Sequence, residues 1–211
     1  KFNGIVSEVV KNHKTGRPVL IGTASVAESE ELAARLKEAG ISCQVLNARN
    51  DSEEARLIAK AGALGAVTVS TNMAGRGTDI KLGGEHEEEK EEVAALGGLY
   101  VIGTNLHESR RIDNQLKGRA GRQGDPGSTR FFISLEDDLL KQYGIRELIP
   151  PSVFPKERDG PLDNPFIARQ AARAQRIIEG QNFEIRRTLN KYWIVTEQQR
   201  QMLFKWRQDI L

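Results

Sequence analysis

The stretch that decides the fold is Val67-Thr68-Val69-Ser70-Thr71-Asn72-Met73-Ala74-Gly75-Arg76-Gly77-Thr78-Asp79, an apolar strand that runs directly into a glycine-rich loop. Apolar runs of the same kind recur through the first two thirds of the chain, as expected for strands that are buried on both faces. The sequence predicts strands at 19–21, 43–46, 66–69, 99–102 and 130–133.

Helical patterns separate these predicted strands. A short amphipathic helix comes first, and Ser25, or Ser29 after it, can cap a second helix that stops at Gly40. Further helices are predicted over 52–60 and 108–120. Because strands and helices alternate, the sequence predicts an α/β fold, with a parallel sheet and helices on both of its faces.

The character of the sequence changes after residue 142. The stretch 143–164 is rich in proline, which predicts a linker or a strap lying across another surface. Asn164-Pro165 then forms a typical helix start. Gly180 costs only about 1 kcal/mol and does not stop the helix, so one long helix is predicted over 165–211. At roughly 70 Å it is too long for the small sheet domain to cover. The predicted parts are therefore 1–142, 143–164 and 165–211.

The loop that follows Val67–Thr71 has the composition of an anion-binding site. Ligands of open parallel sheets bind outside the carboxyl ends of the strands, and glycines allow backbone N–H groups to approach an anion. Arg76 can supply positive charge beside them. The alternative is a tight turn in which Arg76 and Asp79 form a surface pair.

A second basic segment, Gln115-Leu116-Lys117-Gly118-Arg119-Ala120-Gly121-Arg122-Gln123-Gly124-Asp125, is the stronger candidate. Arg119 and Arg122 are three residues apart, so they share a face on a helix or point together at its end. Two guanidinium groups suit a polyphosphate, because they bind its oxygens in bidentate fashion and remain charged. The alternative is a basic helix end that binds its own last carbonyl groups.

Together, the two segments resemble motifs V and VI of the superfamily 2 helicase-like ATPases, in which two RecA-like domains clamp one ATP. The resemblance is closer to the SecA preprotein translocase family. It rests on 72–80, on Gly103-Thr104-Asn105-Leu106-His107-Glu108-Ser109-Arg110-Arg111-Ile112-Asp113-Asn114-Gln115-Leu116 and on Gln181-Asn182-Phe183-Glu184-Ile185-Arg186. It implies a second RecA-like nucleotide-binding domain over 1–142, followed by the start of the family's long scaffold helix.

The resemblance also assigns expected roles to individual residues. It implies that Arg122 is the arginine finger toward the γ-phosphate of ATP, with Arg119 as its companion. Asp79 is expected to contact the nucleotide, and Arg76 to bridge the phosphates and the interface between domains. Two further residues are expected in the same cleft, Gly77 and Gln115. The ligands of the accompanying Mg²⁺ are expected outside this chain.

Partners follow from the resemblance in the same way. They are the preceding nucleotide-binding domain of the same protein, a membrane protein channel, an unfolded preprotein and acidic lipids. The implied location is cytoplasmic, at the periphery of the cell membrane. The long helix leaves a homodimer open. Residues 108, 110 and 111 are expected to couple the two nucleotide-binding domains.

Two departures from the family pattern are the residues at 192–195 and the shortness of the acidic run at 85–92, and a missing motif also affects these expectations. Tyr192-Trp193-Ile194-Val195 stands where the family usually has Tyr-Asp-Asp-Val, which points to a divergent or accessory member. The chain has no G-x-x-x-x-G-K-[ST] phosphate loop, and Leu135-Glu136-Asp137-Asp138 is predicted to open a helix rather than to bind magnesium. The chain by itself is therefore expected to bind nucleotide weakly and to hydrolyse none.

Composition excludes some functions and leaves others open. Lys and Arg number 31 against 29 Asp and Glu, so charge does not favour nucleic acid as a partner. A nucleic-acid helicase remains the main alternative, because motifs V and VI serve both classes, and a scaffold module with purely structural arginines is a third. The single Cys43 cannot form an internal disulfide, which fits a reducing cytosol.

The remaining distinctive residues are given structural interpretations. The acidic run at 85–92 is predicted to be a solvated helix. His107 is predicted to be a hydrogen-bonded structural histidine, and Cys43 a small core residue of its strand. The large apolar residues of the last helix are expected to pack against other parts of the protein, and they include Trp193, Met202 and Trp206.

Overall fold

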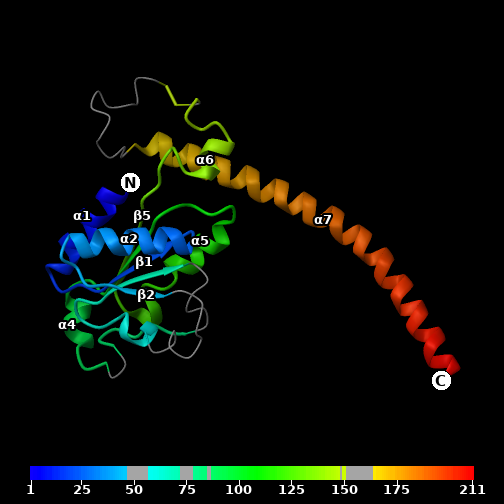
Figure 1. Ribbon diagram of the computed structural model, residues 1–211, viewed down its shortest axis with the longest axis horizontal. Helices are drawn as coiled ribbons and strands as arrows, with labels where there is room; N and C mark the ends of the chain where they lie inside the picture. The colour runs from blue at the N-terminus through cyan, green and yellow to red at the C-terminus, as the bar shows by residue number, and fades with distance from the viewer. Residues whose placement is uncertain (47–56, 72–77, 85–86, 148, 151–163) are drawn as a thin grey trace.

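A five-stranded sheet, parallel throughout, forms the centre of the molecule (Figure 1). The computed structural model describes residues 1–46, 57–71, 78–84, 87–147, 149–150 and 164–211 of the 211-residue chain. The strand order is β2-β3-β1-β4-β5, which confirms the predicted α/β class. The strands are β1 (Val19–Thr23), β2 (Gln44–Leu46), β3 (Val67–Thr71), β4 (Leu99–Gly103) and β5 (Gly127–Phe131).

The central strands are apolar because the sheet is covered on both sides. All five residues of β1 and of β4 are buried, and Val19 lies opposite Val67 on one side and Tyr100 on the other. The edge strand β5 begins at Gly127, three residues before its predicted start. Its first residues are polar and partly exposed, so an apolar run could not mark its beginning.

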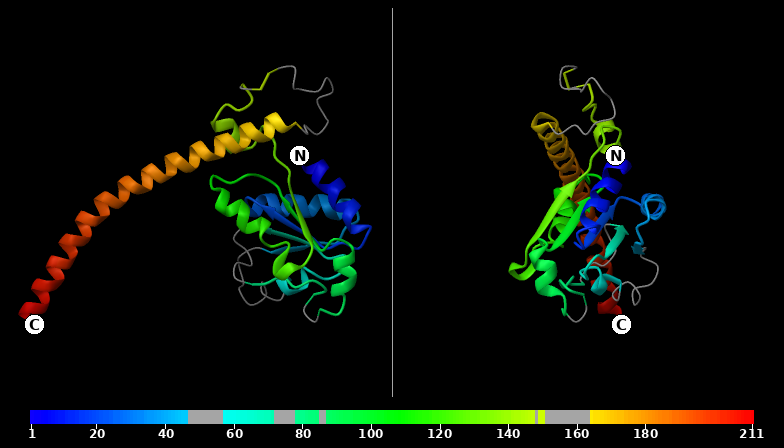
Figure 2. Two further views of the ribbon diagram at one scale, coloured as in Figure 1. Left: turned by 180° about the vertical axis from the view of Figure 1, so that it is seen from behind. Right: turned by 90° about the vertical axis from the view of Figure 1, so that its left-hand side faces the viewer.

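Helices cover both faces of the sheet, as predicted (Figure 2). On one face α1 (Phe2–His13) and α2 (Val26–Glu38) contribute Ile5, Val9, Leu32 and Leu36 to a buried cluster. On the other face α4 (Lys90–Ala95) and α5 (Arg110–Lys117) contribute Val93 and Leu116 to a second cluster. Helix α5 is shorter at both ends than the predicted 108–120.

The start of α2 resolves the choice between its two candidate caps. Ser25 is the N-cap, and its hydroxyl accepts a hydrogen bond of 3.2 Å from the backbone N–H of Glu28. The Glu28 carboxylate accepts in return from the Ala24 N–H at 3.0 Å, a variant of the capping box. Ser29 is buried inside the helix, where its hydroxyl lies 2.6 Å from that of Thr23.

The acidic stretch forms less helix than predicted. Residues 85–86 lie outside the described residues, and helix α4 begins only at Lys90. Glu87 has a φ of 55°, which interrupts a right-handed helix. Hydrogen bonds from Lys81 and then Lys90 hold its carboxylate, and they lower the pKa of Glu87. The predicted helix over 52–60 is helical over 57–60, and its earlier residues lie outside the description.

A third buried cluster lies beside the sheet domain, between α6 (Asp138–Gln142) and the start of α7 (Pro165–Ile210) (Figure 1). Asn164 caps α7 as predicted, accepting a hydrogen bond from the Phe166 N–H at 2.8 Å. Ile145 and Ile149, in the proline-rich stretch, are buried in the same cluster. This part of the stretch is therefore a strap packed on α7, while 151–163 lie outside the described residues.

Helix α7 then leaves the sheet domain as one continuous, gently curved helix of 46 residues (Figure 2). Gly180 does not interrupt it, as predicted. Trp193 and Trp206 are each 60% exposed and Met202 is 54% exposed, because the helix extends past every other described element. That they pack against other parts of the protein stays a prediction. None of the helices among the described residues combines the length and apolarity needed to cross a lipid bilayer.

Candidate functional site at the end of helix α5

The structure brings together two predicted site residues from distant segments. The Arg122 Nη1 group donates to the Asp79 Oδ1 atom, and the two side chains form an ion pair. Gln123 Nε2 donates to the other carboxylate oxygen of Asp79 at 3.3 Å. The side chains of the ion pair are 37% and 40% exposed, so the pair lies at the surface and a ligand can reach it.

Arg119 is directed toward the same segment. Its Nη1 group donates to the backbone carbonyl oxygen of Thr78 at 2.7 Å, one residue before Asp79. Arg122 also donates through Nε to the carbonyl oxygen of Gly118 at 3.0 Å. Arg122 therefore does both things that the sequence left open. Its Nε binds a carbonyl oxygen of its own helix end, and its Nη1 binds Asp79.

Local backbone geometry after α5 positions the two arginines. The helix ends at Lys117 with Gly118 as its C-cap, and Gly121 and Gln123 adopt left-handed conformations with φ of 68° and 53°. These residues turn the chain so that Arg122 follows Arg119 after one tight loop. Below them, Leu116 of α5 and Ile80, next to Asp79, are buried in the same cluster, which joins the two segments through the core.

The other predicted site residues are not seen in contact with the Arg122–Asp79 pair within the described part of the chain. Gln115 is exposed on α5, four residues before Arg119. Arg76 and Gly77 lie outside the described residues, so both the predicted role of Arg76 and the alternative of an Arg76–Asp79 surface pair stay untested.

The donor set of this site fits an oxyanion. Arg119 and Arg122 present planar guanidinium groups that bind phosphate oxygens in pairs. A surface ion pair contributes only about 0–1 kcal/mol, so an incoming phosphate can replace the carboxylate of Asp79 at small cost. Within the described ranges, no group of three or more His, Cys, Asp or Glu side chains is placed to hold a metal ion.

The other end of α5 carries a buried polar network that the sequence did not predict. The Asp113 carboxylate is 2% exposed and accepts from the His107 N–H at 3.1 Å and from His107 Nδ1 at 2.7 Å. Gln175 of α7, itself 4% exposed, donates through Nε2 to Asp113 Oδ2 at 2.6 Å and to the His107 carbonyl at 2.7 Å. The prediction that His107 is structural is confirmed.

Further contacts from α7 reach the residues just before and within the first turn of α5. Glu179 accepts from the Arg110 backbone N–H at 2.6 Å and from Arg110 Nε at 3.0 Å. Asn182 donates to Glu108 at 3.1 Å. The resemblance implies that residues 108, 110 and 111 couple the two nucleotide-binding domains, which stays a prediction; within this chain, Glu108 and Arg110 contact α7. Gln175, Glu179 and Asn182 recur at helical spacing, a signal that could have identified them as one face.

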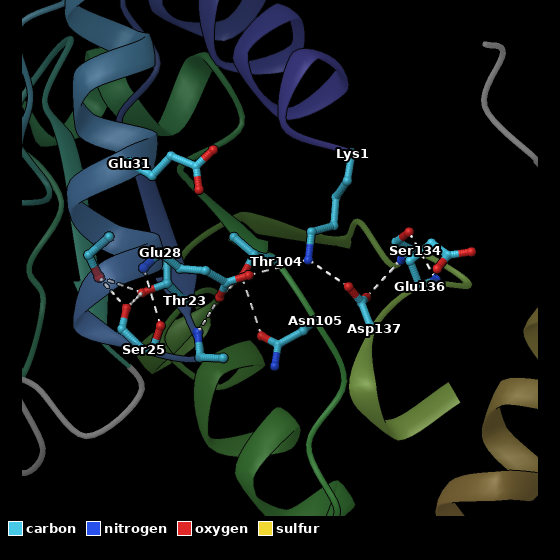
Figure 3. Close-up of polar contacts among 12 residues, drawn as sticks. Lys1, Thr23, Ser25, Glu28, Glu31, Thr104, Asn105, Ser134, Glu136 and Asp137 are labelled. Atoms are coloured by element: carbon cyan, nitrogen blue, oxygen red, sulfur yellow. Dashed lines mark hydrogen bonds and ion pairs between the residues drawn. The ribbon is translucent and has the colours of Figure 1, made fainter. Parts of the chain in front are cut away.

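A separate polar cluster lies where β1 and β4 end, at the point where the strand order reverses (Figure 3). Lys1 Nζ lies 2.7 Å from Asp137 Oδ1 and 3.3 Å from Glu28 Oε1. The Thr104 hydroxyl donates to Glu28 at 3.4 Å. The polar groups of this cluster bind one another, and their contacts join α2 to the turn before α6.

Comparison with known proteins gives consistent matches over the chain. The family described as "SecA P-loop domain" matches residues 1–90 and 85–150, and the family described as "SecA Wing and Scaffold domain" matches residues 161–211. The phosphate-loop sequence itself is absent from the matched residues.

Three relatives illustrate the similarity. "Protein translocase subunit SecA 2" of Clostridioides difficile is 50% identical over 214 residues, which cover 100% of this chain and 27% of the relative. "Protein translocase subunit SecA" of Carboxydothermus hydrogenoformans is 46% identical, and that of Halothermothrix orenii is 51% identical. Each alignment covers all of this chain and 28% or 24% of the relative. The chain thus spans about a quarter of the length of these relatives.

Proposed function

This chain belongs to the SecA family, and on that premise we propose that it is the second nucleotide-binding domain of a protein-translocating ATPase, followed by its scaffold helix. The proposed parts are the domain over 1–142, the linker over 143–164 and the helix over 165–211. The helicase alternative is not favoured, because both family matches and the three relatives are SecA proteins.

In this proposal the preceding nucleotide-binding domain supplies the phosphate loop, and the nucleotide binds between that domain and this site. When bound, ATP supplies a phosphoanhydride whose hydrolysis drives the motor. Arg122 places its guanidinium at the γ-phosphate, where it stabilises the charge that develops during cleavage, and Arg119 supports it. Asp79 holds Arg122 in place before the nucleotide binds and contacts the nucleotide afterwards.

Three more residues complete the proposed site. Arg76 bridges the phosphates and the domain interface, and Gly77 and Gln115 line the cleft. The magnesium ligands lie in the preceding domain. Without that domain the chain lacks most of the charge that cradles the phosphates, so by itself it binds nucleotide weakly and is inactive.

The proposed partners follow from this assignment. They are the preceding nucleotide-binding domain, a membrane protein channel, an unfolded preprotein and acidic lipids, at the cytoplasmic face of the membrane. Nucleotide binding closes the cleft between the two domains and hydrolysis opens it, and α7 carries this movement to the parts that grip the preprotein. The exposed apolar side chains of α7 are then covered by the rest of the protein or by a second copy.

The single observation that carries the proposal is the pairing of Arg122 with Asp79, which unites the two basic motifs in one surface site. The test is Arg122→Ala in the full-length protein, assayed for ATP hydrolysis with unfolded preprotein and acidic vesicles. Turnover should fall by about 100-fold or more. Arg187→Ala is the matched control, because Arg187 is exposed on α7 and lies near Glu184, far from the site.

Two results would count against the proposal. Unchanged turnover in Arg122→Ala would make the arginines structural. Stimulation of hydrolysis by RNA, but not by preprotein with acidic vesicles, would favour the helicase.

A further inference from the structure

Helix α5 connects the contact with α7, at its first turn, to the loop that carries the two arginines, at its C-terminal end. Its first turn and the residues before it contact α7, and its C-terminal end leads into the loop that carries Arg119 and Arg122. The helix has only 8 residues, about 12 Å of length. A change of its tilt or position at the first turn is therefore transmitted directly to the arginine loop.

The contact at the first turn consists of directed hydrogen bonds to the helix backbone. Glu179 accepts from the Arg110 backbone N–H at 2.6 Å, a group at the helix start that has no partner inside the helix. The Ser109 hydroxyl, which is the N-cap, accepts from the Arg111 N–H at a longer 3.4 Å. The hydrogen bond from the Arg110 backbone also lowers the pKa of Glu179, whose carboxylate lies at the positive end of the helix dipole of α5.

Gln175 fixes the same end of α5 from the buried side. Its amide nitrogen bridges Asp113, on α5, and the carbonyl oxygen of His107, just before the helix. All its contacts lie where water is largely excluded, since Gln175 and Asp113 are 4% and 2% exposed. A buried hydrogen bond of this kind admits one arrangement of the two helices and penalises others.

We propose that Gln175 and Glu179 of α7 are positioning residues for the arginine site, which they influence through α5 without touching the nucleotide. Glu179 fixes the height of α5 along its axis and Gln175 fixes its rotation, so that Arg122 meets Asp79. The effect on ATP hydrolysis rests on the proposed function. The coupling between α7 and the loop at 118–124 is a statement about structure and can be tested separately.

The test uses the full-length protein with variants at Glu179, Gln175 and Glu184 of α7, and an Arg122→Ala background. Glu179→Ala removes the acceptor, Glu179→Gln retains an amide oxygen that can still accept from the Arg110 N–H, and Glu184→Ala is the control. Glu184 is exposed on α7, and its ion-pair partner is Arg187 on the same helix. Two quantities are measured, the hydrogen exchange of backbone amides at 118–124 and the kinetic constants of ATP hydrolysis.

Glu179→Ala should raise exchange at 118–124 and lower kcat by between about 10- and 100-fold, with a smaller change in KM. Glu179→Gln should restore most of kcat, and Glu184→Ala should behave as wild type. In an Arg122→Ala background, Glu179→Ala should have little further effect on the rate constant of ATP hydrolysis in long single-turnover assays. The reason is that Glu179 acts through the side chain of Arg122. Gln175→Leu should reproduce the pattern of Glu179→Ala.

Two outcomes would overturn the proposal. Exchange at 118–124 that stays at the wild-type level in both Glu179→Ala and Gln175→Leu would show that α7 does not position the loop. An equal loss of kcat with and without Arg122 would show that Glu179 acts elsewhere. Failure of the proposed function has a different signature, since Arg122→Ala alone would then leave turnover intact while the exchange measurement still reports on the coupling.

Discussion

Arg122 and Asp79 form an ion pair although 43 residues separate them in the sequence. The pair joins the segment that follows β3 to the loop that follows α5, above a shared apolar cluster containing Ile80 and Leu116. It is partly exposed, so it does little for stability and can exchange its carboxylate for another anion. Partial exposure and an exchangeable carboxylate suit a site whose ligand binds between this domain and another one.

Replacing Asp79 should therefore separate stability from activity. For Asp79→Asn, we expect the free energy of unfolding to fall by no more than about 1 kcal/mol, because the lost ion pair is at the surface. We expect ATP turnover of the full-length protein to fall at least about tenfold, because Arg122 loses its guide. Urea unfolding and a steady-state assay measure the two effects. A loss of several kcal/mol would instead mark the pair as structural.

Asp113 should behave in the opposite way. Asp113→Ala leaves the His107 N–H and the Gln175 amide without their buried acceptor, so the free energy of unfolding should fall by about 3 kcal/mol. Asp209→Ala, at the exposed far end of α7, is the control and should change it by less than about 0.5 kcal/mol. Chemical denaturation measures both, and equal stabilities of the two variants would contradict the network.

Tyr100 should make stability depend on pH in the alkaline range. Burial, and then a 2.8 Å hydrogen bond to Glu8, raise the pKa of Tyr100 from 10.0 to about 12. Because the folded pKa lies above the unfolded one, this stabilisation is complete below pH 10 and is lost as the pH rises toward 12. The loss should reach at most about 3 kcal/mol.

The comparison with Tyr100→Phe isolates this effect. The variant has no phenol to ionise at this position, so its stability should fall less than that of wild type between pH 10 and 12. Urea unfolding at several pH values, together with tyrosinate absorbance, gives the two curves. Parallel curves would mean that Tyr100 ionises as easily in the folded protein as in the unfolded chain.

The two tryptophans report on the uncovered part of α7. Trp193 and Trp206 are the only tryptophans of the chain, and each is 60% exposed. At high dilution the 211-residue chain should emit fluorescence with the long wavelength typical of indole in water. A shift to shorter wavelength that grows with protein concentration would show that a second copy covers the helix. Asp209→Ala should follow the wild-type curve, whereas Trp193→Lys should weaken any such shift.

Much of the fold follows from local chemistry that the sequence displays. Asn164-Pro165 specifies the start of α7, because the side-chain cap and the fixed φ of proline act within one turn. The apolar runs at 19–21 and 99–102 specify buried parallel strands for the same local reason. The start of β5 could not be found in this way, since Gly127 pairs with Leu99 through backbone groups alone.

The candidate site was predictable in its parts and not in its assembly. Glycines and arginines at short spacing predicted two anion-binding segments, which contain Arg119, Arg122 and Asp79. No local pattern could show that Arg122 meets Asp79, because that contact depends on how α5 packs on the sheet. Gln175 and Glu179 were missed for a related reason: their helical spacing marks one face of α7, but it does not show which element that face contacts.

The length of α7 has a mechanical consequence. Its first turns contact the rest of the chain as far as Asn182, and residues 183–210 project outward over about 42 Å. A rotation of about 10° at the base of this part would move the far tip by about 7 Å. A movement of that size at the tip exceeds the spacing of about 4.8 Å between neighbouring strands of a sheet.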